Sequence, residues 1–176
     1  MDKQLSSNHL IATDLDRTLF PNGDHAYDLS MAKFSEIRAT YAPQLAYVSG
    51  RNIEDVEQGE REFDAPRADF VGASVGTQVW ESQAGVYKLV NRYAEEVRNQ
   101  DPSYDVKQFR ELIDQHMIRT GDLGLRLQGE AVQFEFKLSY YADVAQRHEI
   151  LAALERVIGG VSPSTQFVWS EDKDEQ

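Results

Sequence analysis

Two aspartates spaced two residues apart directly follow a short apolar segment near the start of the chain. The segment reads Ile11-Ala12-Thr13-Asp14-Leu15-Asp16-Arg17-Thr18-Leu19. An aspartate at the carboxyl end of a strand can act as a covalent nucleophile and form an aspartyl-phosphate. The second carboxylate can serve the leaving group, and the pair supplies oxygen ligands for a hard cation such as Mg²⁺. The segment therefore predicts phosphoryl-transfer chemistry.

Two other interpretations of the Asp14–Asp16 pair are weaker. A calcium-binding loop that starts at Asp14 would need glycine at its sixth position and glutamate at its twelfth, where this chain has Leu19 and His25. An incidental acidic surface loop does not explain the apolar strand that leads into the pair. Open α/β folds bind ligands at the carboxyl ends of their strands, so a functional site is the better interpretation.

The elements that must position this pair alternate between strands and helices. Short apolar runs predict strands over residues 9–13, 44–48 and 68–71. A helix is expected from about Ser30, and a second one follows Asn52, which can cap it. This alternation predicts a parallel sheet with crossovers, of the doubly wound α/β class. Strong turn chemistry lies at residues 20–24. The expected apolar face of the first helix consists of Met31, Phe34 and Ile37.

The pattern changes after about Trp80. A hairpin is expected over residues 77–89, and residues 132–141 alternate apolar and polar side chains as a half-buried strand does. A last strand is expected over residues 165–169. These segments predict an α+β module with an antiparallel sheet. The apolar positions of its two expected helices are Val106, Phe109, Leu112, Ile113 and Met117 in the first, and Ile150, Leu151, Leu154, Val157 and Ile158, after a cap at Asp143, in the second.

The motifs resemble those of the haloacid dehalogenase (HAD) superfamily of aspartate-nucleophile phosphatases. Asp14, Asp16 and Thr18 match its first motif, and Ser49 matches its second. Within the superfamily, the chain is most similar to sucrose-phosphate phosphatases and related sugar-phosphate phosphatases. The stretches that carry this likeness are Ser49-Gly50-Arg51, Val75-Gly76-Thr77-Gln78-Val79-Trp80 and Phe136-Lys137-Leu138-Ser139-Tyr140-Tyr141.

This resemblance implies a mechanism and a set of site residues. Asp14 would be the nucleophile, Asp16 the general acid and base, and both would help to hold Mg²⁺. The substrate would be a sugar phosphate. The phosphoryl group would be bound by Thr18, Ser49 and Gly50, and the rest of the substrate by Arg51, Asn52, Gln133 and Lys137. From the residues alone, Arg51 could equally pair with Glu54 or Asp55. Gln133 could equally lie on a solvated sheet face.

The resemblance also implies a domain organisation. Residues 1–80 would form a partial Rossmann-like (HAD) parallel-sheet core, residues 81–170 an inserted α+β cap, and residues 171–176 an acidic tail. The family's third motif, a lysine, and its fourth, an acidic loop, have no match here. We therefore expect an amino-terminal portion of such an enzyme, with impaired activity and weak Mg²⁺ binding. The edge of the strand at residues 10–13 would be open, which would permit a homodimer.

Composition narrows the classes of function. The net charge of −12 argues against a nucleic-acid-binding surface. No cysteine is present, which excludes disulfides and thiolate chemistry. Without an apolar run of membrane-spanning length or a signal pattern, a cytoplasmic protein without membrane contact is expected. The main alternative function is a non-catalytic HAD-fold binding or regulatory module. A response-regulator domain fits poorly, because its acceptor aspartate follows the third strand.

Overall fold

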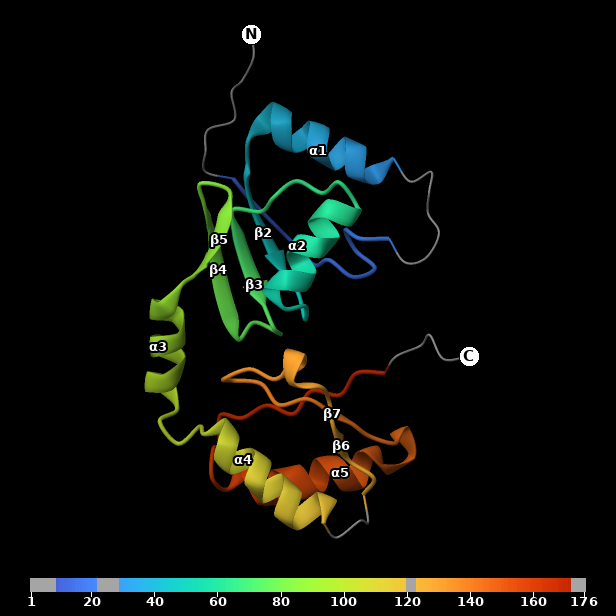
Figure 1. Cartoon of the computed structure of the whole chain (residues 1–176), viewed down its shortest axis with the longest axis vertical. Coiled ribbons are helices and arrows are strands. Elements are labelled where there is room, and N and C mark those ends of the chain that lie inside the picture. Colours follow the sequence, from blue (N-terminus) through green and yellow to red (C-terminus); the bar gives the residue numbers. More distant parts are fainter. Residues whose placement is uncertain (1–8, 22–28, 120–122, 172–176) are drawn as a thin grey trace. The chain divides into compact units, whose positions relative to one another are not determined.

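The computed structural model describes residues 9–21, 29–119 and 123–171, and the chain divides into two compact units, residues 1–94 and 95–176 (Figure 1). In these described ranges no helix is both long and apolar enough to cross a membrane. The elements of the first unit are β1 (Leu10–Thr13), α1 (Ser30–Tyr41), β2 (Gln44–Val48), α2 (Ile53–Glu62), β3 (Phe70–Ala73), β4 (Gln78–Gln83), β5 (Val86–Leu89) and the start of α3 (Asn91–Gln100).

A single five-stranded sheet organises the first unit, in the order β1-β2-β3-β4-β5. The first three strands are parallel, and β4 and β5 add an antiparallel hairpin. The α/β fold with a parallel sheet is therefore confirmed, although β3 begins at Phe70, two residues later than predicted. The predicted domain boundary after residue 80 falls within this hairpin, which continues the first sheet. Most of the predicted turn at residues 20–24 lies outside the described residues.

The three parallel strands bury one face and expose the other. Leu45 and Tyr47 of β2 and Val71 of β3 are fully buried on the first face. Leu10 and Val48, on the opposite face, remain largely exposed. Right-handed crossovers through strands in the order β1-β2-β3 place α1 and α2 on the same side of a sheet. Within the first unit, the described helices α1 and α2 thus cover one side of the sheet, whereas the helices of a doubly wound fold cover both.

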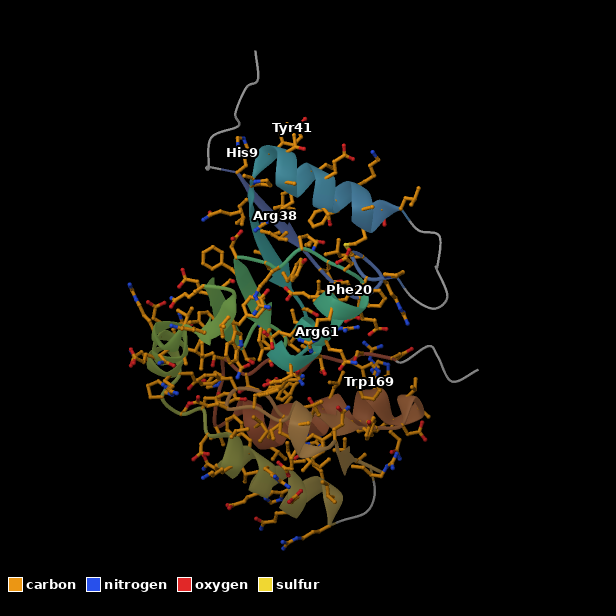
Figure 2. The ribbon with its side chains drawn as sticks, turned by 45° about the horizontal axis from the view of Figure 1, so that its top comes forward. His9, Phe20, Arg38, Tyr41, Arg61 and Trp169 are labelled. Atoms are coloured by element: carbon orange, nitrogen blue, oxygen red, sulfur yellow. The ribbon has the colours of Figure 1, made fainter. Side chains whose placement is uncertain are left out.

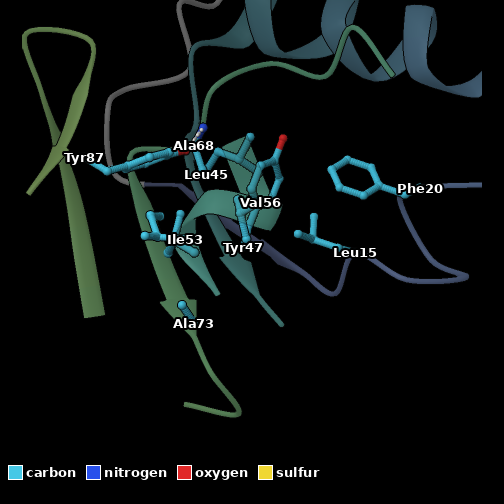
Figure 3. Packing of buried hydrophobic residues seen from close by; sticks show 10 residues of the cluster. Leu15, Phe20, Leu45, Tyr47, Ile53, Val56, Ala68, Ala73 and Tyr87 are labelled. Atoms are coloured by element: carbon cyan, nitrogen blue, oxygen red, sulfur yellow. Dashed lines mark hydrogen bonds between the residues drawn. The ribbon is translucent and has the colours of Figure 1, made fainter. Parts of the chain in front are cut away.

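Helix α2 packs its apolar stripe onto this buried face (Figure 3). The carboxamide oxygen of Asn52 accepts the Asp55 N–H at 2.7 Å, which confirms the predicted cap. Ile53, Val56 and Gly59 follow at helical spacing and are buried. In α1, Met31 and Phe34 pack against the same core, whereas Ile37 is 45% exposed, so the predicted apolar face of α1 is right only at its first two positions.

Buried polar groups fasten the hairpin to α2. The Tyr87 hydroxyl donates to Glu60 Oε1 at 2.5 Å, and the Ala68 N–H donates to the same oxygen at 3.3 Å. Arg67 reaches the other oxygen of Glu60 at 3.3 Å and lies over the Tyr87 ring, 3.9 Å from its centroid. Burial raises the pKa of Glu60, and it also raises that of Tyr87. This network joins β5, α2 and the loop before β3.

Gly59 is required by the close approach of Phe20 (labelled in Figure 2). A Cβ at position 59 would lie 2.3 Å from Phe20 Cε2, and Phe20 is only 1% exposed. We expect Gly59→Ala to destabilise the fold by about 1–2 kcal/mol, because overpacking outweighs the better helix propensity of alanine. Urea unfolding measures this, with Gly160→Ala as the control because nothing lies within 4 Å of its Cβ position. Unchanged stability of Gly59→Ala would contradict the packing described here.

The second unit packs helices over a small sheet. Phe109, Ile113, Met117, Ile150 and Ile158 are buried in its core, as the helical spacing predicts. Its elements after α3 are α4 (Val106–Ile113), the π-helical turn η1 (Asp114–Ile118), β6 (Arg126–Leu127), the 3₁₀ turn η2 (Glu130–Val132), β7 (Tyr140–Tyr141), the 3₁₀ turn η3 (Val144–Gln146), α5 (Arg147–Leu154) and the π-helical turn η4 (Glu155–Gly159). Asp143 caps the turn that leads into α5, as predicted.

The long strand predicted over residues 132–141 is wrong. Only Tyr140 and Tyr141 are in a strand, paired with β6, and Phe134 and Lys137 exchange backbone hydrogen bonds across a tight turn. The Gln133 side chain forms hydrogen bonds with backbone groups that a neighbouring strand would otherwise pair. It donates to the carbonyls of Gln128 and Ser139 and accepts the Ser139 N–H at 2.8 Å. The last predicted strand, residues 165–169, is also wrong, since no ladder forms there.

A carboxylate joins two segments of the second unit that lie 61–63 residues apart in the sequence. Asp101, which follows α3, accepts hydrogen bonds from the hydroxyls of Ser103, Ser162 and Ser164, with the Ser162 contact at 2.5 Å. These hydroxyl donors lower the pKa of Asp101. Ser162 is fully buried and lies just beyond η4. The segment just after α3 and the segment just beyond η4 therefore meet at one side chain.

Candidate active site

Three loops meet at the carboxyl edge of the parallel strands. Residues 14–18 follow β1, residues 49–52 follow β2, and residues 74–77 follow β3. Backbone hydrogen bonds join the second and third loops: the Ser74 N–H donates to the Arg51 carbonyl at 2.7 Å, and the Val75 N–H donates to the Ser49 carbonyl at 3.2 Å. Strand order thus brings Asp14 and Ser49 to neighbouring positions on one edge of the sheet.

Asp14 is exposed at the tip of β1, in a loop anchored by buried apolar side chains. The Leu15 carbonyl accepts three backbone N–H groups, from Thr18, Leu19 and Phe20, at 2.7–3.2 Å. The side chains of Leu15 and Phe20 are buried, so the intervening loop is held at both ends. The Thr18 hydroxyl donates to Asp14 Oδ2 at 3.2 Å. An exposed carboxylate on a rigid loop is suited to act as a nucleophile or as a metal ligand.

Asp16 forms an ion pair with Arg51 that links the first loop to the second. Arg51 Nη2 donates to Asp16 Oδ1 at 2.6 Å, and Arg51 Nε lies 3.0 Å and 3.1 Å from the two carboxylate oxygens. The hydrogen bond to Asp16 raises the pKa of Arg51, so the guanidinium is always charged. This partner is neither of those weighed from the sequence, although Arg51 Nη1 also donates to the Asp55 carbonyl at 3.3 Å.

The remaining residues of the second loop differ in accessibility. Ser49 is only 5% exposed, and its Oγ accepts the Arg51 N–H at 3.2 Å. Gly50 is exposed, with nothing within 4 Å of its Cβ position, so a ligand can approach its backbone closely. Asn52 uses its side-chain oxygen to cap α2. The loop therefore offers an open backbone beside a buried hydroxyl.

The third loop contains a residue that the sequence analysis missed. Ser74 is fully buried, and both Ser74 and Val75 have positive φ, 54° and 62°. A β-branched residue in the left-handed region is strained, and such strain often lies at functional sites. The Tyr93 hydroxyl donates to the Gly76 carbonyl at 2.6 Å, which ties the loop to the start of α3. The rule that ligands bind at carboxyl ends of strands, applied to β3, would have identified this loop.

The two predicted substrate residues of the second unit differ in how much they offer a ligand. All three hydrogen bonds of the Gln133 amide go to backbone groups, which leaves one lone pair of its oxygen for a ligand. Lys137 lies at the end of the 134–137 turn, with its Nζ 5.8 Å from the centroid of the Phe134 ring. Partial burial lowers the pKa of the Lys137 ammonium. Lys137 is therefore the better placed of the two for recognition.

A metal ion would find hard oxygen donors at Asp14 and at the backbone carbonyl of Asp16. Across residues 9–21, 29–119 and 123–171, no group of three or more His, Asp or Glu side chains is arranged to hold a metal. Mg²⁺ is commonly held by one or two carboxylates together with water and substrate phosphate oxygens. The donor set thus fits a Mg²⁺ site that is completed by groups from outside these residues.

A parallel sheet whose first strand ends in Asp14-x-Asp16, beside a serine after the second strand, is the arrangement expected of a protein of the HAD superfamily. Solved structures share this fold. The chain resembles a sucrose-phosphatase from Synechocystis sp. PCC6803, solved in complex with sucrose and phosphate, with a TM-score of 0.68 and 17% identity over 87% of this chain and 57% of that one. It also resembles the HAD-like hydrolase YhjK from Bacillus subtilis, with a TM-score of 0.54 and 15% identity over 87% of this chain and 55% of that one.

Sequence comparison identifies the family. Residues 7–174 match the model of the sucrose-6F-phosphate phosphohydrolase family, and the chain belongs to this family. A HAD-like hydrolase from Nitrosococcus oceani is 30% identical over 171 residues, which cover 95% of this chain and 44% of that protein. The chain thus spans somewhat under half of this curated relative.

Proposed function

We propose that the chain contributes the nucleophile and the acid–base residue of a Mg²⁺-dependent sugar-phosphate phosphatase. The observation that carries the proposal is the placement of Asp14 and Asp16 at the end of β1, beside the loop that follows β2. Family membership and the sucrose-bound relative support a phosphorylated sugar, such as sucrose 6-phosphate, as the substrate.

The reaction proceeds in two steps. A carboxylate oxygen of Asp14 attacks phosphorus, the bond from phosphorus to the sugar oxygen breaks, and protonated Asp16 gives its proton to that oxygen. Asp16 then takes a proton from water as the water oxygen attacks phosphorus, and the bond from phosphorus to Asp14 breaks to release phosphate. When bound, Mg²⁺ neutralises charge between the carboxylates and the phosphoryl oxygens.

The neighbouring groups have supporting roles. The Thr18 hydroxyl donates to Asp14 and orients the nucleophile, and its one O–H can turn to a phosphoryl oxygen when substrate is bound. The exposed backbone at Gly50 and the hydroxyl of Ser49 complete the phosphate site, and Ser49 can donate its O–H to a phosphoryl oxygen while its oxygen still accepts the Arg51 N–H. The second unit acts as the cap that recognises the sugar, with Lys137 among its contacts.

We expect the 176-residue chain to release phosphate from sucrose 6-phosphate slowly and only with Mg²⁺. Turnover is slow because the described residues give the cation few protein ligands, and it should stop when EDTA is added. Phosphate release measured with and without EDTA tests this. Rapid release that is indifferent to EDTA would contradict the proposal.

A non-catalytic HAD-fold binding module is the second candidate. It is favoured by the small set of metal ligands among the described residues. Mg²⁺ with beryllium fluoride separates the two, because it forms an acyl-phosphate mimic only on a competent aspartate. A modified Asp14 supports the enzyme, and an unmodified one supports the binding module.

Two further expectations concern location and assembly. Strand β1 lies at the edge of the sheet within the described residues, which supports the expectation of an open edge. Pairing of two chains along this edge stays a prediction, and so does a cytoplasmic location.

A further inference from the structure

The contact between Arg51 and Asp16 is more constrained than an ordinary surface ion pair. The guanidinium approaches the carboxylate side-on, with three N–O contacts of 2.6–3.1 Å. It also lies over the ring of the buried Phe20, 5.3 Å from the centroid. The two charged side chains are 29% and 49% exposed, respectively. One side chain therefore touches both the second aspartate and the residue that closes its loop.

The backbone of Arg51 is fixed as firmly as its side chain. Its N–H donates to Ser49 Oγ, and its carbonyl accepts the Ser74 N–H at 2.7 Å. Because both the backbone and the side chain of Arg51 are already held, the side chain loses little further conformational freedom when the guanidinium binds a carboxylate. Isolated surface pairs are weak chiefly because they must restrain two long, flexible side chains. Lysine could not reproduce the planar, multi-donor contact.

We propose that Arg51 is a positioning residue for Asp16. It holds the carboxylate of Asp16, and with it the loop of residues 14–20, where Asp16 can exchange a proton with the leaving oxygen and with water. The inference rests on the proposed function and deepens it. A displacement of about 1 Å of a catalytic group can lower a rate about 10²-fold. Loss of Arg51 should therefore slow each step in which Asp16 transfers a proton.

A double-mutant cycle tests whether Arg51 acts through Asp16. We expect Arg51→Gln to slow phosphate release from sucrose 6-phosphate about 10–100-fold, and to add nothing in an Asp16→Ala background. Arg51→Lys should recover part of the loss. An Arg51→Gln effect that appears in full in the Asp16→Ala background would overturn the proposal.

The leaving group gives a second readout. p-Nitrophenolate leaves as a stable anion and needs no proton, so its release in the first turnover should fall less than about threefold in Arg51→Gln. If Arg51 had a merely structural role, Arg51→Gln would lower the rates for both substrates equally. Arg38→Gln is the matched control, since Arg38 (labelled in Figure 2) pairs with Asp69 at 2.8 Å in the same unit. It should leave the ratio of the two rates unchanged.

Amide hydrogen exchange tests whether Arg51 holds the loop of residues 14–20 in place, and this measurement does not depend on enzyme activity. The N–H groups of Thr18, Leu19 and Phe20, all donated to the Leu15 carbonyl, should exchange faster in Arg51→Gln than in the wild type. Unchanged protection would refute positioning whatever the activity. If the wild type releases no phosphate from either substrate, the proposed function fails, and the exchange result alone decides the role of Arg51.

Discussion

Replacing Asp14 by asparagine is expected to reduce phosphate release at least about 10³-fold, the largest catalytic effect in the chain. An amide has nearly the shape of the carboxylate but cannot form the aspartyl-phosphate, so both chemical steps lose their covalent path. The variant should fold normally because Asp14 is exposed and the loop is held by Leu15 and Phe20. Radiometric phosphate release from sucrose 6-phosphate with Mg²⁺ provides the measurement.

Asp64→Asn is the matched control for this substitution. Asp64 is an exposed carboxylate with a φ of 52°, a conformation that asparagine also adopts readily, and it lies outside the three loops of the site. Its activity should equal that of the wild type. Normal activity of Asp14→Asn would rule out Asp14 as the nucleophile, and equal losses in both variants would indicate a general effect on the fold.

The largest expected effect on stability is that of Glu60→Ala, which should lower the free energy of unfolding by about 3 kcal/mol. Glu60 is 7% exposed and accepts hydrogen bonds from Tyr87, Ala68 and Arg67. Removing it leaves the buried Tyr87 hydroxyl without its acceptor and a guanidinium without one of its counterions, although the Ala68 N–H keeps the Tyr87 oxygen at 3.1 Å. Glu57→Ala is the control, because Glu57 pairs with the same Arg67 but is more exposed, and it should lose no more than about 1 kcal/mol.

The same residue gives stability a defined dependence on pH. Burial raises the pKa of Glu60 in the folded state above its ordinary value of 4.5. Its contribution to stability is therefore fully present below that value and is lost as pH rises through the folded pKa. Glu60→Gln does not titrate at this position, so the wild type should lose stability relative to Glu60→Gln over the pH range that starts at 4.5 and extends upward through the raised pKa of Glu60. Urea unfolding of both proteins across this range measures the difference, and a constant difference would contradict the burial of an ionisable Glu60.

Local signals in the sequence predicted the first unit well. The bounds of β2 and the cap of α2 follow from short apolar runs and from Asn52, whose effects extend over only a few residues. The carboxyl-end rule then brought Asp14 and Ser49 to one edge of the sheet without any knowledge of long-range contacts. Membership of the HAD superfamily, predicted from the same residues, is confirmed by the family match.

Long-range contacts could not be predicted in the same way. Alternation over residues 132–141 is typical of a strand, but it does not reveal that the Gln133 amide satisfies backbone groups that a ladder would otherwise pair. The partner of Arg51 lies 35 positions away, so acidic residues close in sequence were the natural candidates. The hairpin joined the first sheet rather than a second module because Tyr87 and Glu60 meet in its core.

The meeting of Asp101 with Ser162 and Ser164 has a consequence for how such proteins can be built. The stretch of chain between these residues starts and ends at nearly the same point in space. Domains whose two ends are adjacent tolerate insertion into a loop of another protein. Recombination at two neighbouring positions could therefore exchange this stretch for another while the three loops that follow β1, β2 and β3 stayed untouched. Under the proposed function, new substrate specificities would then arise from exchange of this stretch alone.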